Sequence, residues 1–290
     1  MSTQVLVLNR ENSKWEENSR LVYKFPQPAD FQDTEYEVTL GFASVPFSWR
    51  NITAARGNNT FTYTWYVNGV PTDTLITLPD GYYTVDFVNQ FIESQLIAAK
   101  RYYIDADGKN VYPIRLASNA TYYKLQFELS SQVKDAVELA SLGYTLPAGV
   151  TTENYDPTGR SPIVKIQTPG FSKWSGFSIQ DIGGIVNPVN PAYYLGDLQF
   201  PTVDPVSSVN ITTNLIENTL QLNKNLTTFI PTVSYGEYIK IEPVNSYWQD
   251  VTKYTYDRVT IQFEDQAGDL LKVLDNDIVV LLLIREKKLS

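Results

Sequence analysis

Two neighbouring acids, Glu264 and Asp265, are the residues in this chain whose chemistry most resembles that of a hydrolase. A pair of carboxyl groups cleaves a glycosidic bond when the groups flank a cleft about 5 Å or about 6.5–9.5 Å apart. Successive residues at the end of a strand point to opposite faces, so this pair does not fit that geometry. We therefore interpret both residues as part of a solvated turn and keep glycoside hydrolysis only as an alternative function.

The segment from Asp105 to Asn110 has the alternating acids of a calcium-binding loop. An EF-hand loop requires glycine at its sixth position and glutamate at its twelfth. In this segment the glycine is the fourth residue and the twelfth is Leu116. An Asp-Gly hairpin turn is therefore the preferred interpretation.

Three tryptophans, Trp65, Trp174 and Trp248, could stack on sugar rings. Aromatic side chains also bury a large apolar area, so the same residues could fill a sandwich interior or an interface. We favour this second role. A carbohydrate-binding jelly roll, such as a lectin or a receptor-binding spike head, is the alternative function.

The chain contains neither histidine nor cysteine. This excludes histidine general bases, Ser-His and Cys-His nucleophiles, disulfides, and metals held by thiolate or imidazole. We expect no enzyme, no catalytic residues, no cofactor and no metal site. Only Ca²⁺ or Mg²⁺ could use the oxygen ligands that remain. The net charge of −9 argues against a sequence-independent nucleic-acid binder.

The clearest element is a strand, turn and helix between Asp73 and Arg101. Pro79-Asp80-Gly81 breaks the alternating strand, and Thr84 follows as a helix N-cap. Apolar residues then recur every three or four positions up to Leu96, which predicts one amphipathic helix.

In most of the remaining chain, apolar and polar residues alternate, as they do in β-strands. The predicted strands are Gln4–Leu8, Leu21–Phe25 (ended by Pro26 and Pro28), Tyr36–Val45, Phe61–Val67, Thr74–Leu78, Val111–Leu116, Tyr122–Leu129, Ile163–Gln167, Val209–Thr213, Gly236–Val244, Arg258–Glu264 and Ile278–Ile284. The last is apolar throughout and is expected to be buried on both faces. A short helix is predicted over Ser131–Leu142, and an elaborated loop region over Tyr144–Asp204.

No membrane span is expected, because the longest apolar run is far shorter than the roughly 20 residues that cross a bilayer. The first residues also lack the charged and apolar regions of a secretory signal, so we expect a reducing, soluble compartment. About eight principal strands predict an all-β fold, the single jelly roll, which is an eight-stranded antiparallel β-sandwich with one helix after an early strand.

Three blocks of the sequence resemble the penton, or minor capsid, proteins of virophages and Polinton-like viruses. The first is the turn Leu78–Thr84 after the aromatic strand around Asn59–Tyr66. The second is Leu139–Tyr144. The third combines three segments in the family's order: Ser208–Ile216, Gly236–Pro243 and Arg258–Gly268.

The resemblance implies a jelly roll with an inserted β-rich upper domain. We assign residues 1–100 and 206–290 to the jelly roll and 101–205 to the insertion. The resemblance also implies homopentamers at the five-fold vertices of an icosahedral virion, assembled in the host cytoplasm beside a double-jelly-roll major capsid protein. A host receptor or glycan is left open as a partner of the insertion. We expect the tails, Met1–Leu8 and Leu289–Ser290, to be free to reach neighbouring subunits.

Overall fold

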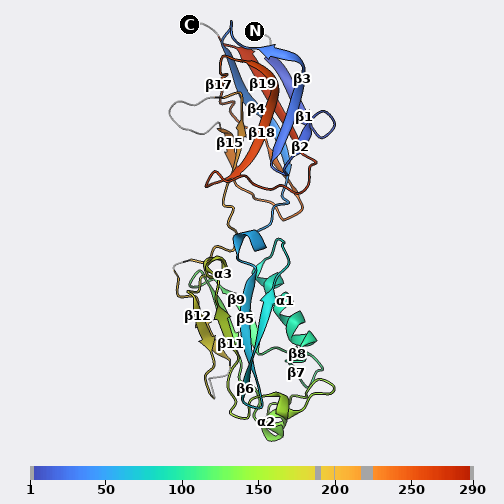
Figure 1. Cartoon of the computed structure of the whole chain (residues 1–290), viewed down its shortest axis with the longest axis vertical. Coiled ribbons are helices and arrows are strands. Elements are labelled where there is room, and N and C mark those ends of the chain that lie inside the picture. The colour runs from blue at the N-terminus through green and yellow to red at the C-terminus, as the bar shows by residue number, and fades with distance from the viewer. Residues whose placement is uncertain (1–2, 187–190, 199, 217–224, 288–290) are drawn as a thin grey trace. The chain divides into compact units, whose positions relative to one another are not determined.

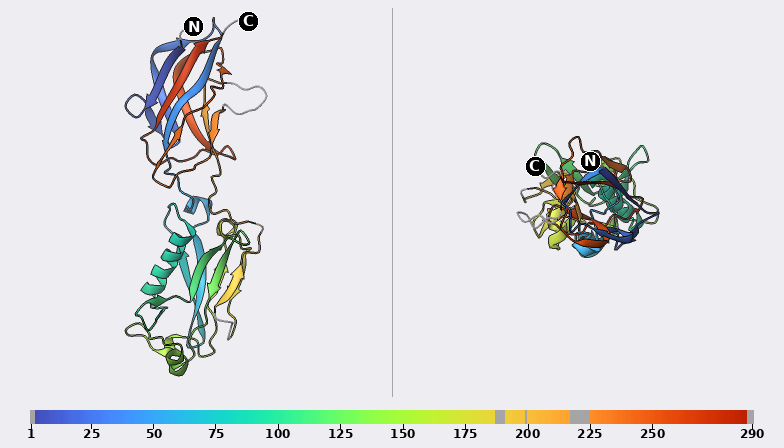
Figure 2. Two further views of the ribbon diagram at one scale, coloured as in Figure 1. Left: turned by 180° about the vertical axis from the view of Figure 1, so that it is seen from behind. Right: turned by 90° about the horizontal axis from the view of Figure 1, so that it is seen from above.

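The structure, a computed structural model, describes residues 3–186, 191–198, 200–216 and 225–287. The chain divides into two compact units. The first combines Met1–Trp49 with Val206–Ser290, and the second is Arg50–Pro205. Figures 1 and 2 show the blue and the orange to red strands in the first unit and the cyan to yellow elements in the second.

The first unit is a sandwich of two antiparallel sheets. Its strands are β1 (Thr3–Asn9), β2 (Lys14–Glu16), β3 (Arg20–Asp30), β4 (Tyr36–Pro46), β14 (Val209–Thr213), β15 (Asn225–Phe229), β16 (Tyr238–Ile241), β17 (Gln249–Asp250), β18 (Thr255–Asp265) and β19 (Val279–Glu286). One sheet has the order β1-β19-β4-β16, with β17 also on β4, and the other has the order β15-β14-β18-β3-β2.

Without the short β2 and β17, eight of these strands give the orders 1-8-3-6 and 2-7-4-5 when numbered along the chain. This interleaving of early and late strands is the jelly roll, made of two Greek keys. The predicted fold class is therefore confirmed. The second unit leaves the jelly roll after its third strand, β4, and returns before its fourth, β14.

The last strand, β19, alternates rather than being buried on both faces as predicted. Val280, Leu282 and Ile284 are buried in the sandwich, whereas Leu281 and Leu283 are half-buried on the outer face. Those two leucines cover Gly41 of β4, where an added Cβ would lie 2.5 Å from a Leu281 methyl carbon. The outer face is apolar because it packs over this glycine, at a bulge in the ladder.

The prolines at 26 and 28 do not end β3, contrary to the prediction. The pairing of β3 with β18 shifts register between its segments at Lys24 and Ala29, and β2 covers only Arg20–Val22. The prolines therefore occupy an interrupted part of the ladder, where a missing N–H costs no hydrogen bond.

The prediction that the N-terminal segment is free to reach neighbouring subunits was also wrong, because β1 pairs with β19 over its whole length. Leu289 and Ser290 lie outside the described residues.

The second unit has three sheets and three α-helices within the described residues. Its elements are β5 (Thr60–Val67), β6 (Val70–Thr77), α1 (Val85–Ala98), β7 (Tyr103–Ile104), β8 (Asn110–Val111), β9 (Ile114–Asn119), β10 (Lys124–Leu129), α2 (Ala136–Ser141), β11 (Ile163–Ile166), α3 (Pro169–Ser175), β12 (Gln180–Gly183) and β13 (Ala192–Leu195). The sheet orders are β12-β11-β5-β6, β13-β10-β9 and β7-β8.

The expected boundary at residue 100 differs from the structure, in which the second unit starts at Arg50. The hairpin β5-β6 and the helix α1 belong to this unit, because β5 pairs with β11 and α1 packs on β9. Alternation alone does not show which sheet a strand joins, so the sequence placed this hairpin in the jelly roll.

The predicted helix α1 is confirmed, with the Thr84 hydroxyl accepting a hydrogen bond from Phe87 N and the face from Val85 to Leu96 buried. The helix expected over Ser131–Leu142 is shorter, because Asp135 caps it and Val133 is buried before it begins. Pro113 separates β8 from β9, where one strand was predicted. The helix α3 was missed, although Thr168, Pro169 and Gly176 occupy its N-cap, first-turn and C-cap positions.

Candidate functional site

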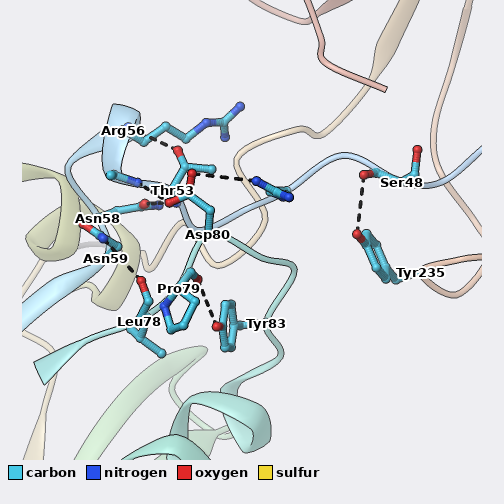
Figure 3. Close-up of polar contacts among 12 residues, drawn as sticks. Ser48, Thr53, Arg56, Asn58, Asn59, Leu78, Pro79, Asp80, Tyr83 and Tyr235 are labelled. Atoms are coloured by element: carbon cyan, nitrogen blue, oxygen red, sulfur yellow. Dashed lines mark hydrogen bonds and ion pairs between the residues drawn. The ribbon is translucent and has the colours of Figure 1, made fainter. Parts of the chain in front are cut away.

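The turn from Leu78 to Tyr83 is held by the loop that precedes β5 (Figure 3). Asp80 accepts a hydrogen bond from Ala54 N at 2.7 Å, and Asn59 donates from its side-chain amide to the Leu78 carbonyl at 3.3 Å. The Tyr83 hydroxyl donates to the carbonyl of Pro79 at 2.9 Å. The turn that carries the first family-like block is therefore a rigid junction between a strand and a helix.

Asn51 extends this junction to the end of the second unit. Its side chain is buried, accepts from Tyr83 N at 2.7 Å, and donates to the carbonyls of Tyr83 at 2.8 Å and Val203 at 3.0 Å. A single amide thus fixes the segment around Val203 beside the start of α1. Leaving one of these buried groups unpaired would cost about 1–3 kcal/mol.

The helix α3 holds the same segment from the other side. The Trp174 indole donates to the Val203 carbonyl at 3.2 Å, and Thr202 N donates to Lys173 O at 3.0 Å. Gly176 ends the helix with φ of 76°, and a Cβ there would lie 3.2 Å from Pro201. The Trp174–Gly176 stretch therefore positions Pro201–Asp204 as one wall of a groove.

The opposite wall is the turn between β9 and β10. The groove has a volume of about 530 Å³ and is lined by Ser118, Asn119, Ala120, Tyr123, Lys124, Leu125 and Pro201–Asp204. That volume falls within the range of about 300–1,000 Å³ typical of small-ligand sites. It is larger than the hollow lined by Glu16, Arg20 and Arg258, at about 300 Å³, and than the one lined by Tyr103 and Tyr144, at about 110 Å³, so we take it as the candidate functional site.

Two charged side chains line this groove. The Lys124 ammonium donates to the carbonyl of Gly196 at 2.6 Å, and Asp204 accepts from the Tyr82 hydroxyl at 3.4 Å. Burial, and then the charge of Asp204, raises the pKa of Tyr82, so its phenol stays neutral and able to donate at physiological pH. The lining therefore carries one positive and one negative group.

The tryptophans considered for sugar stacking do not face this groove with free rings. Trp65 and Trp174 are each 1% exposed, and Trp65 donates to the carbonyl of Asn154 at 3.0 Å. The Arg285 guanidinium lies 3.8 Å from the ring centroid of Trp248. The interpretation as packing residues is thus correct for Trp65 and Trp174. The exposed aromatic residue in the groove is Tyr123, which was predicted to lie within the strand Tyr122–Leu129 but lies in the turn before β10.

Glu264 and Asp265 are the last two residues of the jelly-roll strand β18, and both carboxylates accept hydrogen bonds there. Burial raises the pKa of Glu264, and a hydrogen bond from the Thr212 hydroxyl partly opposes this shift. Asp265 accepts from the backbone N–H groups of Ala267 and Asp269 at 2.9 and 3.1 Å. The second carboxylate organises a turn, as the sequence indicated, and the two acids do not face each other across a groove.

Asp105 closes the hairpin between β7 and β8. Its carboxylate accepts from the N–H groups of Asp107 and Lys109 at 3.0 and 2.8 Å. Within the described ranges no group of three or more acidic side chains is placed to hold a metal ion. No helix in the part of the chain that the structure describes is long and apolar enough to cross a membrane.

The jelly roll offers a second kind of surface at its two lateral edges. At one edge, β1 exposes Val5 and Val7, with exposed fractions of 58% and 38%. At the opposite edge, β16 exposes Tyr238, and Tyr235 and Ile230 are exposed on the segment before it. Edge strands with exposed apolar residues favour pairing with another chain.

Neither a family model nor a curated protein matches the sequence. Among solved structures, the chain is similar to the mavirus penton protein. The match covers 99% of this chain and 98% of the penton chain, with 12% sequence identity and a TM-score of 0.44. The chain is also similar to a chain of the Sputnik virophage, whose structure was solved by electron cryomicroscopy. That match covers 98% of this chain and 96% of the other, with 12% sequence identity and a TM-score of 0.36. The first of these is a penton protein, the class that the three sequence blocks resemble.

Proposed function

We propose that this chain is a structural capsid protein of an icosahedral virion, with no enzymatic activity. The observation that carries the proposal is the strand order of a single jelly roll whose chain leaves after β4 for a separate unit and returns at β14. The three sequence blocks that resemble virophage and Polinton-like penton proteins support it. Fold alone does not fix function, so the proposal rests on fold and blocks together.

The finer proposal is a homopentamer at the five-fold vertices, beside a double-jelly-roll major capsid protein and assembled in the host cytoplasm. The second unit, Arg50–Pro205, would contact a host receptor or glycan. A carbohydrate-binding spike protein is the second candidate, favoured by the groove at the β9–β10 turn.

Closing a ring requires a heterologous interface, in which one edge of the subunit meets a different edge of the next. The jelly roll has two such edges, β1 with Val5 and Val7, and β16 with Tyr238 and its flanking apolar residues. We propose that these edges meet in the pentamer. Buried apolar area at the contact would supply the association energy.

Ring formation should strengthen as salt is added. Each copy carries a net charge of −9, so neighbouring copies repel one another. Raising ionic strength from about 0.1 M to about 1 M shortens the screening length from ~10 Å to ~3 Å and weakens that repulsion. Sedimentation velocity across this range should show a shift from the 32.9 kDa monomer toward five times that mass.

Two valine variants with matched exposure locate the interface. Val5→Lys should abolish the pentamer, because it places a charge on the β1 edge, whereas Val70→Lys should leave it intact. Val70 is an equally exposed valine, at 62%, on the edge strand β6 of the second unit. Ile230→Lys, at the β16 edge, should also abolish the ring. In a mixture of the two variants, the intact β16 edge of Val5→Lys can meet the intact β1 edge of Ile230→Lys. The mixture should therefore give dimers and no larger assemblies, because both remaining edges of each dimer carry a substitution. Pentamers that persist in Val5→Lys would overturn the proposed edge contact.

A further inference from the structure

We propose that the groove between the β9–β10 turn and Pro201–Asp204 binds a neutral saccharide, with Tyr123 as the ring on which a sugar stacks. The inference rests on the attachment role proposed above for the second unit and assigns that role to named residues. The turn joins two paired strands of one sheet, so its position in the unit is fixed by β9 and β10.

Tyr123 is placed where a packing residue would not be expected. Its side chain is 70% exposed, and its backbone has φ of 53°, in the left-handed region. That conformation favours Gly, Asn or Asp and is rare for a bulky side chain. A tyrosine here accepts backbone strain without gaining burial, and such residues cluster at ligand-binding sites.

The Tyr123 ring is also held in position. Phe200 packs against it edge-on, with ring centroids 5.7 Å apart and an interplanar angle of 68°. Phe200 is itself 56% exposed and adjoins the wall that starts at Pro201. Edge-on contact leaves a face of the Tyr123 ring available, which is the arrangement that stacking on the apolar face of a sugar requires.

The charges of the lining select a neutral ligand. Lys124 and Asp204 carry opposite charges, and the Lys124 ammonium already donates to Gly196 O at 2.6 Å. An anionic ligand would meet Asp204, and a cationic one would meet Lys124. The hydroxyls of a neutral sugar can accept from the ammonium and donate to the carboxylate at once. The hydroxyl of Ser118 and the amide of Asn119 add further partners.

The test is binding of the full chain to a printed panel of neutral di- to tetrasaccharides of glucose, galactose, mannose and N-acetylglucosamine. Saturation-transfer NMR on the sugars that bind then gives affinities. Tyr123→Asn removes the ring and suits the left-handed backbone, so the turn keeps its fold. It should weaken binding by about tenfold or more, whereas Tyr123→Phe should stay within about twofold of the native chain.

Tyr122→Ala is the matched control, because Tyr122 is a 60% exposed neighbour that does not line the groove. It should bind like the native chain. The inference is overturned if no neutral saccharide binds at millimolar concentration, if only sialylated or sulfated sugars bind, or if Tyr123→Asn binds normally. Each of these results leaves the capsid proposal standing, and a sugar-binding chain that is absent from virions would overturn the capsid proposal alone.

Discussion

Trp65→Ala should destabilise the second unit by about 3–5 kcal/mol, the usual loss when a buried aromatic residue becomes alanine in a packed core. Trp65 is 1% exposed in the strand β5, and its ring contacts Tyr155 edge-on, with ring centroids 5.4 Å apart. The substitution also removes the donor to the Asn154 carbonyl and one of the two rings beneath the Arg101 guanidinium.

Hydrogen exchange followed by mass spectrometry should locate this loss in β5, β6 and β11, with the jelly-roll strands unchanged. Trp248→Ala is the matched control. Trp248 is a half-buried tryptophan of the jelly roll whose ring lies under Arg285, so its removal should cost less and should leave the second unit unaffected. Equal losses of protection in both units after Trp65→Ala would show that the two units do not unfold separately.

Replacing residues 50–205 with a short Gly-Ser linker should leave a folded jelly roll. All ten strands described for the sandwich lie outside the excised segment, and so does its core, which includes Leu21, Val38 and Phe263. Closing a shorter loop between β4 and β14 adds little entropic cost. The shortened protein should show β-sheet circular dichroism and one cooperative urea transition.

The matched control for this excision removes only residues 101–205. That deletion leaves β5, β6 and α1 behind without β11 and β9, so their apolar faces lose their partners. We expect this protein to aggregate or to expose apolar surface. If the first excision fails to fold and the second succeeds, the unit boundary at Trp49 is wrong and the boundary at residue 100 is right.

Local signals in the sequence predicted the elements that depend on short-range physics. The helix α1 follows from Thr84 and the spacing of Val88, Ile92 and Leu96, and each of these residues has its predicted role. The jelly roll follows from the count and alternation of strands, as in β18. In both cases the period of the apolar residues and the capping residue decide the structure.

The sequence could not give what depends on pairing between distant segments. The hairpin β5-β6 was placed in the wrong unit because its partner, β11, lies a hundred residues further on. Pro26 and Pro28 were expected to end a strand, since nothing local indicates an interrupted ladder.

The groove was missed for the same reason. Its walls come from the β9–β10 turn and from Pro201–Asp204, which only the tertiary fold brings together. Tyr122 and Tyr123 have high β propensity, so the pattern extended the strand through the turn that displays them. The short helix α3 supports the second wall of the groove. Its capping residues, Thr168 and Gly176, are a local signal from which this helix could have been predicted.

The most direct test of the central claim is a reconstruction of the virion by electron cryomicroscopy, with the five-fold vertices resolved well enough to trace side chains. Our account predicts five copies of this chain at each vertex, with the β1 edge of one jelly roll against the β16 edge of the next. Density for this chain at any other position, or its absence from purified particles, would contradict the account.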